Sequence, residues 1–236
     1  MSTDEDFDAT VRASDPDRWL AARFIADPAA RADVVLLYAL NHELARVAEI
    51  VSEPMLGHIR LAWWREGLEE AAAGGAVLDH PVLKAMAGAL ASGAFSLEDL
   101  TALVDGRAGD LELHLLADDA ALEAHLDATA VRLGAIAAKR LDATSSPEAV
   151  RAALRAWGLA GLHRARRLPP GRSEEEVVSR VEADLATSRA VLQALPVAAF
   201  PAVAYATFSR DYVRGREPGP LSRRLRLLKA VLAGRI

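Results

Sequence analysis

Residues 38–70 read YALNHELARVAEIVSEPMLGHIRLAWWREGLEE, and this stretch decides how the whole chain is interpreted. Its apolar residues recur every three or four positions, which is the spacing of an amphipathic helix. The pair Glu53-Pro54 interrupts the pattern, because a residue before proline avoids helical backbone. The stretch therefore predicts two helices that meet at this pair. Its acids, arginines, histidines and adjacent tryptophans lie on core-forming helices, so we expect any functional site to be centred here.

Proline and capping signals locate the other helices. Asp15-Pro16, Asp27-Pro28 and Ser146-Pro147 each place a capping side chain before a proline at the first helical position. No segment shows a sustained two-residue alternation, and no Ser/Gly-rich linker divides the chain. We expect an all-α protein in which residues 1–14 form an acidic, flexible N-terminus and residues 15–236 form one helical domain. The expected helices, about ten in number, cover residues 16–25, 29–51, 55–73, 80–91, 97–110, 119–142, 147–163, 174–194, 199–213 and 220–233.

Composition limits the classes of protein to consider. With 236 residues, of which 52% are hydrophobic and 26% are charged, the chain can bury a sizeable core. It has no cysteine, so disulfides and thiolate metal sites are excluded. The longest nearly apolar run, residues 194–208, is shorter than the roughly 20 residues that a membrane span needs. The acidic N-terminus does not resemble a secretory signal. We expect a cytoplasmic protein that can associate with the inner face of the membrane.

The net charge of −5 is unevenly distributed, with an acidic N-terminus and basic segments at residues 151–172 and 214–236. This asymmetry indicates either an anionic partner or solvated helix faces that balance one another. In the last expected helix, Leu221, Leu225, Leu228 and Leu232 form one stripe. A basic amphipathic helix of this kind can lie on an anionic lipid surface. It can equally dock its leucines on the domain, which is the commoner arrangement and the one that we expect.

Several chemistries lack the residues that they need. The six histidines do not show the spacing of a helical zinc site. The chain contains no G-x-x-x-x-G-K loop, no G-x-G-x-x-G loop and no G-x-S-x-G elbow, so nucleotide cradling and α/β-hydrolase chemistry have no support. The basic segments lack interleaved aromatic residues, and we expect no nucleic-acid partner.

Four segments carry a resemblance to the squalene/phytoene synthase family: Tyr38-Ala-Leu-Asn41, Val51-Ser-Glu-Pro54, Gly57-His-Ile-Arg60 and Trp64-Arg-Glu66. The resemblance implies an isoprenoid-synthase-like helical bundle. In active members it implies a Mg²⁺-dependent prenyltransferase that condenses two isoprenoid diphosphates head to head, with aspartate motifs on two helices. Aligned on Tyr38, the first D-D-x-x-D motif is replaced by Ala45, Arg46 and Glu49. The segment 158–164 resembles the approach to the second motif, but no D-x-x-x-D follows it.

Arg46 argues against a magnesium site on this helix. A guanidinium about 5 Å from Mg²⁺ would cost roughly 6–7 kcal/mol at an effective dielectric near 20. Arg46 also lies three residues from Glu43 and three from Glu49, so we expect both acids to be its ion-pair partners.

The phrase Asn41-His-Glu-Leu-Ala-Arg-Val47, followed by Val51-Ser-Glu53, more closely resembles a catalytically degenerate branch of the family. That branch lacks the aspartate motifs and includes an assembly factor of respiratory complex I. The resemblance implies a non-catalytic protein without a cofactor, with complex I subunits or assembly proteins as partners. One alternative is an active prenyltransferase that takes its magnesium ligands from Glu49, Glu53 and Asp110. A second alternative is an isoprenoid- or lipid-binding module.

Ten residues are candidates for a cavity or binding site, and none is expected to be catalytic or to bind metal: Tyr38, Asn41, Glu43, Arg46, Glu49, Glu53, Arg60, Trp64, Arg107 and Asp110. The acids and Arg46 either line a former substrate cavity or form ion pairs on an exposed helix face. Arg60 and Trp64, four residues apart, can stack as a cation–π pair. Arg107 and Asp110 either face the same cleft or cap a helix end, and the sequence favours the cap.

Overall fold

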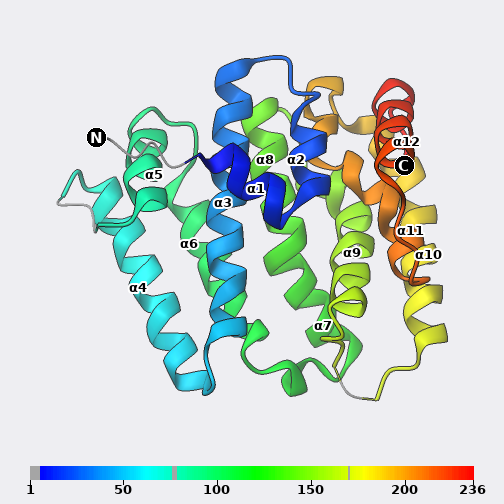
Figure 1. Ribbon diagram of the computed structural model, residues 1–236, viewed down its shortest axis with the longest axis horizontal. Coiled ribbons are helices and arrows are strands. Elements are labelled where there is room, and N and C mark those ends of the chain that lie inside the picture. Colours follow the sequence, from blue (N-terminus) through cyan, green and yellow to red (C-terminus); the bar gives the residue numbers. More distant parts are fainter. Residues whose placement is uncertain (1–5, 76–78, 170) are drawn as a thin grey trace.

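The computed structural model describes residues 6–75, 79–169 and 171–236, and within these ranges the protein contains helices and no strands (Figure 1). The α-helices are α1 (Phe7–Ser14), α2 (Pro16–Ala22), α3 (Pro28–Ile50), α4 (Pro54–Ala72), α5 (Pro81–Ala91), α6 (Leu97–Gly106), α7 (Asp119–Leu126), α8 (Arg132–Leu141), α9 (Pro147–Arg164), α10 (Glu174–Val191), α11 (Ser209–Tyr212) and α12 (Pro220–Ala233). Short 3-10 turns cover Arg107–Asp110, Leu113–Leu116, Leu192–Ala194, Val197–Ala202 and Ala204–Phe208, and a π-helical turn covers Asp127–Val131. The expectation of an all-α architecture is confirmed.

The capping residues act as the sequence predicts. The side chain of Asp15 accepts from the backbone N–H of Arg18, and that of Asp27 accepts from Ala29 at 2.9 Å. Ser146 begins α9 in the same way. These bonds satisfy N–H groups that have no partner inside the helix, and the prolines fix the backbone of the first turn. The starts of α2, α3 and α9 therefore lie within one residue of the predicted positions.

Three local predictions are wrong. Residues 7–14, expected to be flexible, form α1, because Asp6 caps the helix and Val11 is buried against the domain; residues 1–5 lie outside the described ranges. The expected helix over 119–142 is divided by the π-helical turn, where the hydroxyl of Thr129 donates to the carbonyl of His125 at 2.7 Å. The expected helix over 199–213 is mainly 3-10 turns, because Pro201 cannot donate a helical hydrogen bond.

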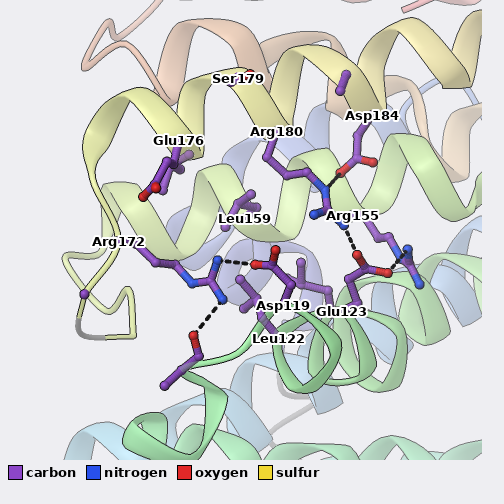
Figure 2. A pocket seen from close by; sticks show the side chains of 15 residues that line it. Asp119, Leu122, Glu123, Arg155, Leu159, Arg172, Glu176, Ser179, Arg180 and Asp184 are labelled. Atoms are coloured by element: carbon purple, nitrogen blue, oxygen red, sulfur yellow. Dashed lines mark hydrogen bonds and ion pairs between the residues drawn. The ribbon is translucent and has the colours of Figure 1, made fainter.

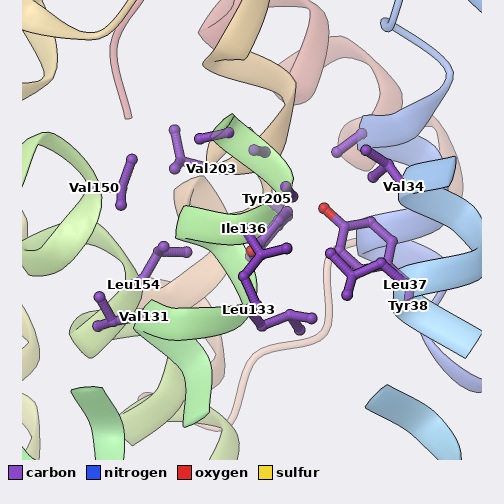
Figure 3. Packing of buried hydrophobic residues seen from close by; sticks show 14 of the residues in the cluster. Val34, Leu37, Tyr38, Val131, Leu133, Ile136, Val150, Leu154, Val203 and Tyr205 are labelled. Carbon is purple, nitrogen blue, oxygen red and sulfur yellow. The ribbon is translucent and has the colours of Figure 1, made fainter. Parts of the chain in front are cut away.

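The core lies where α3, α8 and α9 run beside one another in the middle of the molecule. Figure 3 shows α3 residues facing side chains of α8 and α9, among them Leu37, Leu133, Ile136 and Leu154. Full burial of each such side chain contributes about 1.5–3 kcal/mol relative to exposure. Tyr38 also belongs to this cluster, so α3 supports the core with one face and leaves the adjacent face for a cavity.

The leucine stripe of α12 does not dock on the domain, contrary to the sequence-based expectation. Leu227 and Ala230 point inward and are buried, whereas Leu221, Leu225, Leu228 and Leu232 are exposed. Arginines hold α12 in this orientation: Arg226 pairs with Asp211 and donates to the carbonyl of Thr207 at 2.9 Å. Along the described part of the chain, no helix is both long enough and apolar enough to cross a bilayer.

Candidate functional site

A cavity of about 350 Å³ lies between α3 and α9, closed by the start of α2, the 107–110 turn and the end of α7. Five of the ten candidate residues line it: Tyr38, Asn41, Glu49, Arg107 and Asp110. On the α9 side its wall is formed by Trp157, Gly158, Gly161 and Leu162. Helices that are far apart in the sequence thus bring these side chains to one place.

Asp110 is buried in the wall of this cavity and is fully engaged by neighbours. Its carboxylate is 2.9 Å from Nη1 of Arg107 and 3.3 Å from Nε2 of His125. Burial alone would raise the pKa of Asp110, but Arg107 and His125 together hold that pKa well below its usual value. Arg107 also donates to the side-chain oxygen of Asn41. Arg107 and Asp110 therefore face the cleft, rather than serving only as the helix cap that the sequence favours.

Arg18 of α2 also lines the cavity. It is buried, and its Nη1 lies 2.6 Å from the carboxylate of Asp15. Its guanidinium carbon is 4.9 Å from the ring centre of Tyr205, 5.6 Å from Trp157 and 5.8 Å from Tyr38. Burial is the largest single effect and disfavours the charged form, but Asp15, Tyr205 and Tyr38 together outweigh it and raise the pKa of Arg18 above its usual value. The guanidinium of Arg18 is therefore charged, and its charge is stabilised by the carboxylate of Asp15 and by the three aromatic rings.

Sequence reasoning missed Arg18 and His125. The Asp15-Pro16 cap was recognised, but it gave no reason to place Arg18 in a cavity formed by other helices. His125 is one of six histidines whose spacing indicates no metal site. Nothing local in the sequence shows that it lies beside Asp110, because α7 and the 107–110 turn meet only through the tertiary fold.

The remaining candidates lie outside the cavity wall. Arg46 is exposed and pairs with Glu43 at 3.5 Å, as predicted, but the predicted pair with Glu49 is not formed among the described residues. Glu49 lines the cavity instead, and Arg46 does not. Adjacent residues on a helix point about 100° apart, and it is Ala45 that faces the cavity. Glu53 is exposed at the start of α4 and makes no capping hydrogen bond.

The expected stack of Arg60 on Trp64 is not formed. Arg60 is exposed, whereas Trp64 is buried with its ring centre 4.7 Å from His80 and 5.2 Å from Trp63. Trp64 therefore supports the α4–α5 contact and does not line the cavity.

A second cavity, of about 440 Å³, lies between α7, α9 and α10, and none of the ten candidates lines it (Figure 2). Arg155 pairs with Glu123 at 2.8 Å, Arg172 pairs with Asp119 at 2.6 Å, and Arg180 bridges Glu123 and Asp184. Burial raises the pKa of Asp184 to about 6. The arginines of the 151–172 segment that reach this cavity are thus neutralised by acids of the fold, as the interpretation of balanced faces predicts.

Comparison with known proteins identifies the family of this chain. Residues 11–165 match the family model described as squalene/phytoene synthase. The chain belongs to this family. The matched span runs from α1 to the end of α9 and contains both walls of the first cavity. No curated protein matches the chain.

Solved structures agree with this squalene/phytoene synthase assignment at the level of the fold. A dehydrosqualene synthase crystallised in complex with a ligand superposes with a TM-score of 0.71 at 13% identity, covering 96% of this chain and 94% of the other. Squalene synthase HpnC from Alicyclobacillus acidocaldarius gives a TM-score of 0.65 at 15% identity, covering 97% and 94%. The isoprenoid-synthase-like fold is therefore confirmed, and the complex I branch stays a prediction.

The squalene/phytoene synthase family implies Mg²⁺, but the residues of the first cavity do not fit it. Magnesium needs oxygen ligands in octahedral geometry, usually carboxylates together with substrate phosphates. On α3 only Glu49 offers a free carboxylate to the cavity, and the facing residues of α9 have no acid. Asp15 and Asp110 are already bonded to arginines. In the described ranges, no group of three or more acids or histidines is arranged to hold a metal ion.

Proposed function

We propose that this chain is a non-catalytic squalene/phytoene synthase-fold protein that acts in the cytoplasm as an assembly factor of respiratory complex I. The observation that carries the proposal is the Asp110–Arg107–His125 network. The acid that could best supply a carboxylate to the cavity is instead neutralised by an arginine 2.9 Å away. The role in complex I assembly rests on the resemblance of residues 41–53 to the degenerate branch.

Electrostatics support the loss of diphosphate chemistry. A divalent cation that entered the first cavity would be repelled by the guanidinium groups of Arg18 and Arg107. The acids paired with these arginines cannot turn toward the metal ion, because that would leave the guanidinium charges without a partner. Stabilising Mg²⁺ there would require breaking at least one of these pairs, which costs about 3–5 kcal/mol. Glu49 alone cannot offset that cost.

An assembly factor must bind another protein, and α4 offers a suitable surface. Ile50 at the end of α3 and Met55, Leu56, Ile59 and Trp63 of α4 are exposed, and Met55, Ile59 and Trp63 recur every four residues along one side of α4. We term these five residues the α4 face. Contiguous apolar patches on a protein surface commonly mark interaction sites, and aromatic residues are enriched at interface centres. We assign the α4 face to a complex I subunit or assembly protein.

Gene deletion tests the role directly. We expect the deletion strain to have less assembled complex I and lower NADH:quinone activity, both restored by the wild-type gene. The variant Ile59→Glu/Trp63→Glu should fail to restore them, whereas Leu115→Gln, which changes an exposed leucine on a different element, should succeed. Normal complex I in the deletion strain would show that the proposed role is wrong.

Loss of catalysis is tested separately with purified protein. We expect no diphosphate release from farnesyl or geranylgeranyl diphosphate in the presence of Mg²⁺. Diphosphate release at a rate above the background without protein would contradict the non-catalytic assignment and favour the prenyltransferase alternative.

A second candidate function, an isoprenoid- or lipid-binding module, is favoured by one observation. The Nε atoms of Arg18 and Arg107 are buried and have no acceptor among the described residues. The anionic head group of a lipid could accept hydrogen bonds from these two Nε–H groups while Tyr38 and Trp157 contact the lipid's apolar chain. Mass spectrometry of the purified protein tests this, since a stoichiometric co-purified lipid that is lost in Arg107→Met would support it.

A further inference from the structure

Helix α12 presents a continuous apolar face to solvent. Leu221, Leu225, Leu228 and Leu232 are spaced by four, three and four residues, so they lie on one side of the helix. Their exposed fractions are 70%, 58%, 41% and 79%. Four exposed leucines in a row on one helix exceed the scattered apolar residues that a protein surface normally carries. We term this surface the α12 face.

The opposite side of α12 is already committed to the domain. Leu227 and Ala230 are buried there, and Arg226 pairs with Asp211. Arg223 pairs with Glu217 at 2.7 Å and lies 3.6 Å from the buried carboxylate of Asp17. Turning the leucines inward would therefore break several ion pairs. The exposure of the α12 face is built into the way the helix docks.

Cations flank the α12 face on both sides. Arg224 and Lys229 are exposed, and around the helix axis they lie about 70° from the centre of the leucine stripe, one on each side. Arg235 is also exposed and follows the end of the helix. None of the three forms an ion pair with a described residue, and residues 218–236 include no aspartate or glutamate. An apolar stripe edged by free cations is the pattern of a helix that lies in the interface of an anionic bilayer.

We propose that α12 docks this protein on an anionic membrane surface, with its four leucines at the boundary between head groups and acyl chains. Arg224, Lys229 and Arg235 would then contact lipid phosphates. A second copy of the chain is a poorer occupant, because a symmetric contact between two α12 faces would bring their cations together. The inference is independent of the role in complex I assembly, since it rests on α12 alone.

Vesicle co-sedimentation of the full chain tests the proposal. We expect binding to phosphatidylcholine vesicles in which about a third of the lipid is phosphatidylglycerol, and little binding to vesicles of pure phosphatidylcholine. Leu221→Gln/Leu225→Gln/Leu232→Gln and Arg224→Gln/Lys229→Gln/Arg235→Gln should each weaken binding by about a hundredfold. Leu115→Gln/Val197→Gln, which removes two exposed apolar residues outside both the α4 face and the α12 face, should bind like the wild type. Circular dichroism checks that every variant is folded, which is expected because all the changed side chains are on the surface.

Three results would overturn the proposal. The first is failure of the wild type to bind the anionic vesicles. The second is equal binding by the wild type and the folded leucine variant. The third is a wild-type protein that is a dimer by light scattering and does not bind vesicles, together with a leucine variant that is a monomer. This result would assign the α12 face to a second copy. Complex I levels are not a readout here, so failure of this proposal is separable from failure of the assembly role.

Discussion

Asp110 shows how a single carboxylate can be withdrawn from metal chemistry while remaining ionised. Replacing it by asparagine leaves the largely buried guanidinium of Arg107 without its counter-charge. We expect Asp110→Asn to lower the free energy of unfolding at pH 7 by about 3 kcal/mol, measured by urea denaturation. The pKa of Asp110 is lowered in the folded state, so its contribution is present above the unfolded pKa and is lost as the pH falls through the folded pKa.

The matched control for this prediction is Asp79→Asn. Asp79 pairs with Lys84 on the surface, and exposed ion pairs contribute little because water and salt screen them. We expect its urea midpoint to match that of the wild type. Equal stability of Asp110→Asn and Asp79→Asn would contradict the description of Asp110 as a buried, essential counter-charge.

Asp184 should respond to pH in the opposite sense. Burial raises its pKa to about 6 from 3.8, so the folded protein binds a proton there more tightly than the unfolded chain. The stability from this group is complete below about pH 4 and is lost as the pH rises through 6. We expect Asp184→Asn to raise the free energy of unfolding at pH 7.5 by about 2 kcal/mol and to leave it nearly unchanged at pH 4, measured by urea denaturation at both values.

Glu123 provides a control of opposite sign in the same cavity. Its pKa is lowered, chiefly by the hydrogen bond from Arg180, so its charged form stabilises the fold. Glu123→Gln should therefore destabilise the protein at pH 7.5. If both variants shift stability in the same direction, the second cavity does not have the charge distribution described for it.

At the scale of elements, close contact between α6 and the π-helical turn depends on Gly106. A methyl group there would meet the backbone carbonyl group of Ala128, with the carbonyl carbon only 2.9 Å away. Backbone cannot move aside as a flexible side chain can, so we expect Gly106→Ala to lower the thermal midpoint and to reduce stability by about 1–3 kcal/mol. In contrast, Gly88 in α5 faces open space, and Gly88→Ala should raise stability by about 0.5 kcal/mol. A stabilised Gly106→Ala protein would be evidence against this contact.

The sequence predicts most helices because their boundaries are local. A capping side chain and a proline act within one turn, so Asp15, Asp27 and Ser146 identify helix starts without any tertiary information. The side of α12 that faces the domain is different, because it depends on contacts with other helices: Asp17 of α2, near the other end of the chain, and Asp211 of α11. The leucine pattern alone fits two orientations, and the commoner one is wrong here.

The candidate site is predicted only in part for the same reason. Residues 38–49 identify the helix that lines the cavity, but a helix exposes several faces, and only the fold shows that Ala45 rather than Arg46 points inward. Arg107 and Asn41, which share a hydrogen bond, are 66 positions apart in the sequence. No local pattern connects them.

At the scale of the whole molecule, the two ends of the described chain are linked through buried Asp17 of α2. Tyr212 of α11 donates a hydrogen bond to Asp17, and Arg223 of α12 lies 3.6 Å from it. Burial raises the pKa of Asp17, so the carboxylate depends on these partners. We expect Tyr212→Phe to cost about 1–2 kcal/mol and to speed amide hydrogen exchange in α2 and α12 together.

Mass spectrometry of exchanged peptides measures that effect, with Leu221→Gln as the control on the exposed side of α12. The control should leave exchange in α2 unchanged, because Leu221 contributes nothing to the buried link. Faster exchange confined to α12 in Tyr212→Phe would show that Asp17 does not couple the two helices.

Helix α4, which carries the α4 face, and helix α12 lie on opposite sides of the molecule along its longest axis (Figure 1). Occupants of two such distant surfaces do not compete for space, and their binding free energies should add. A lipid surface at α12 and a protein at α4 could then be held at once, with each raising the effective local concentration of the other. In such an arrangement the helical body is a spacer, and its length fixes how far from the bilayer the second partner is held.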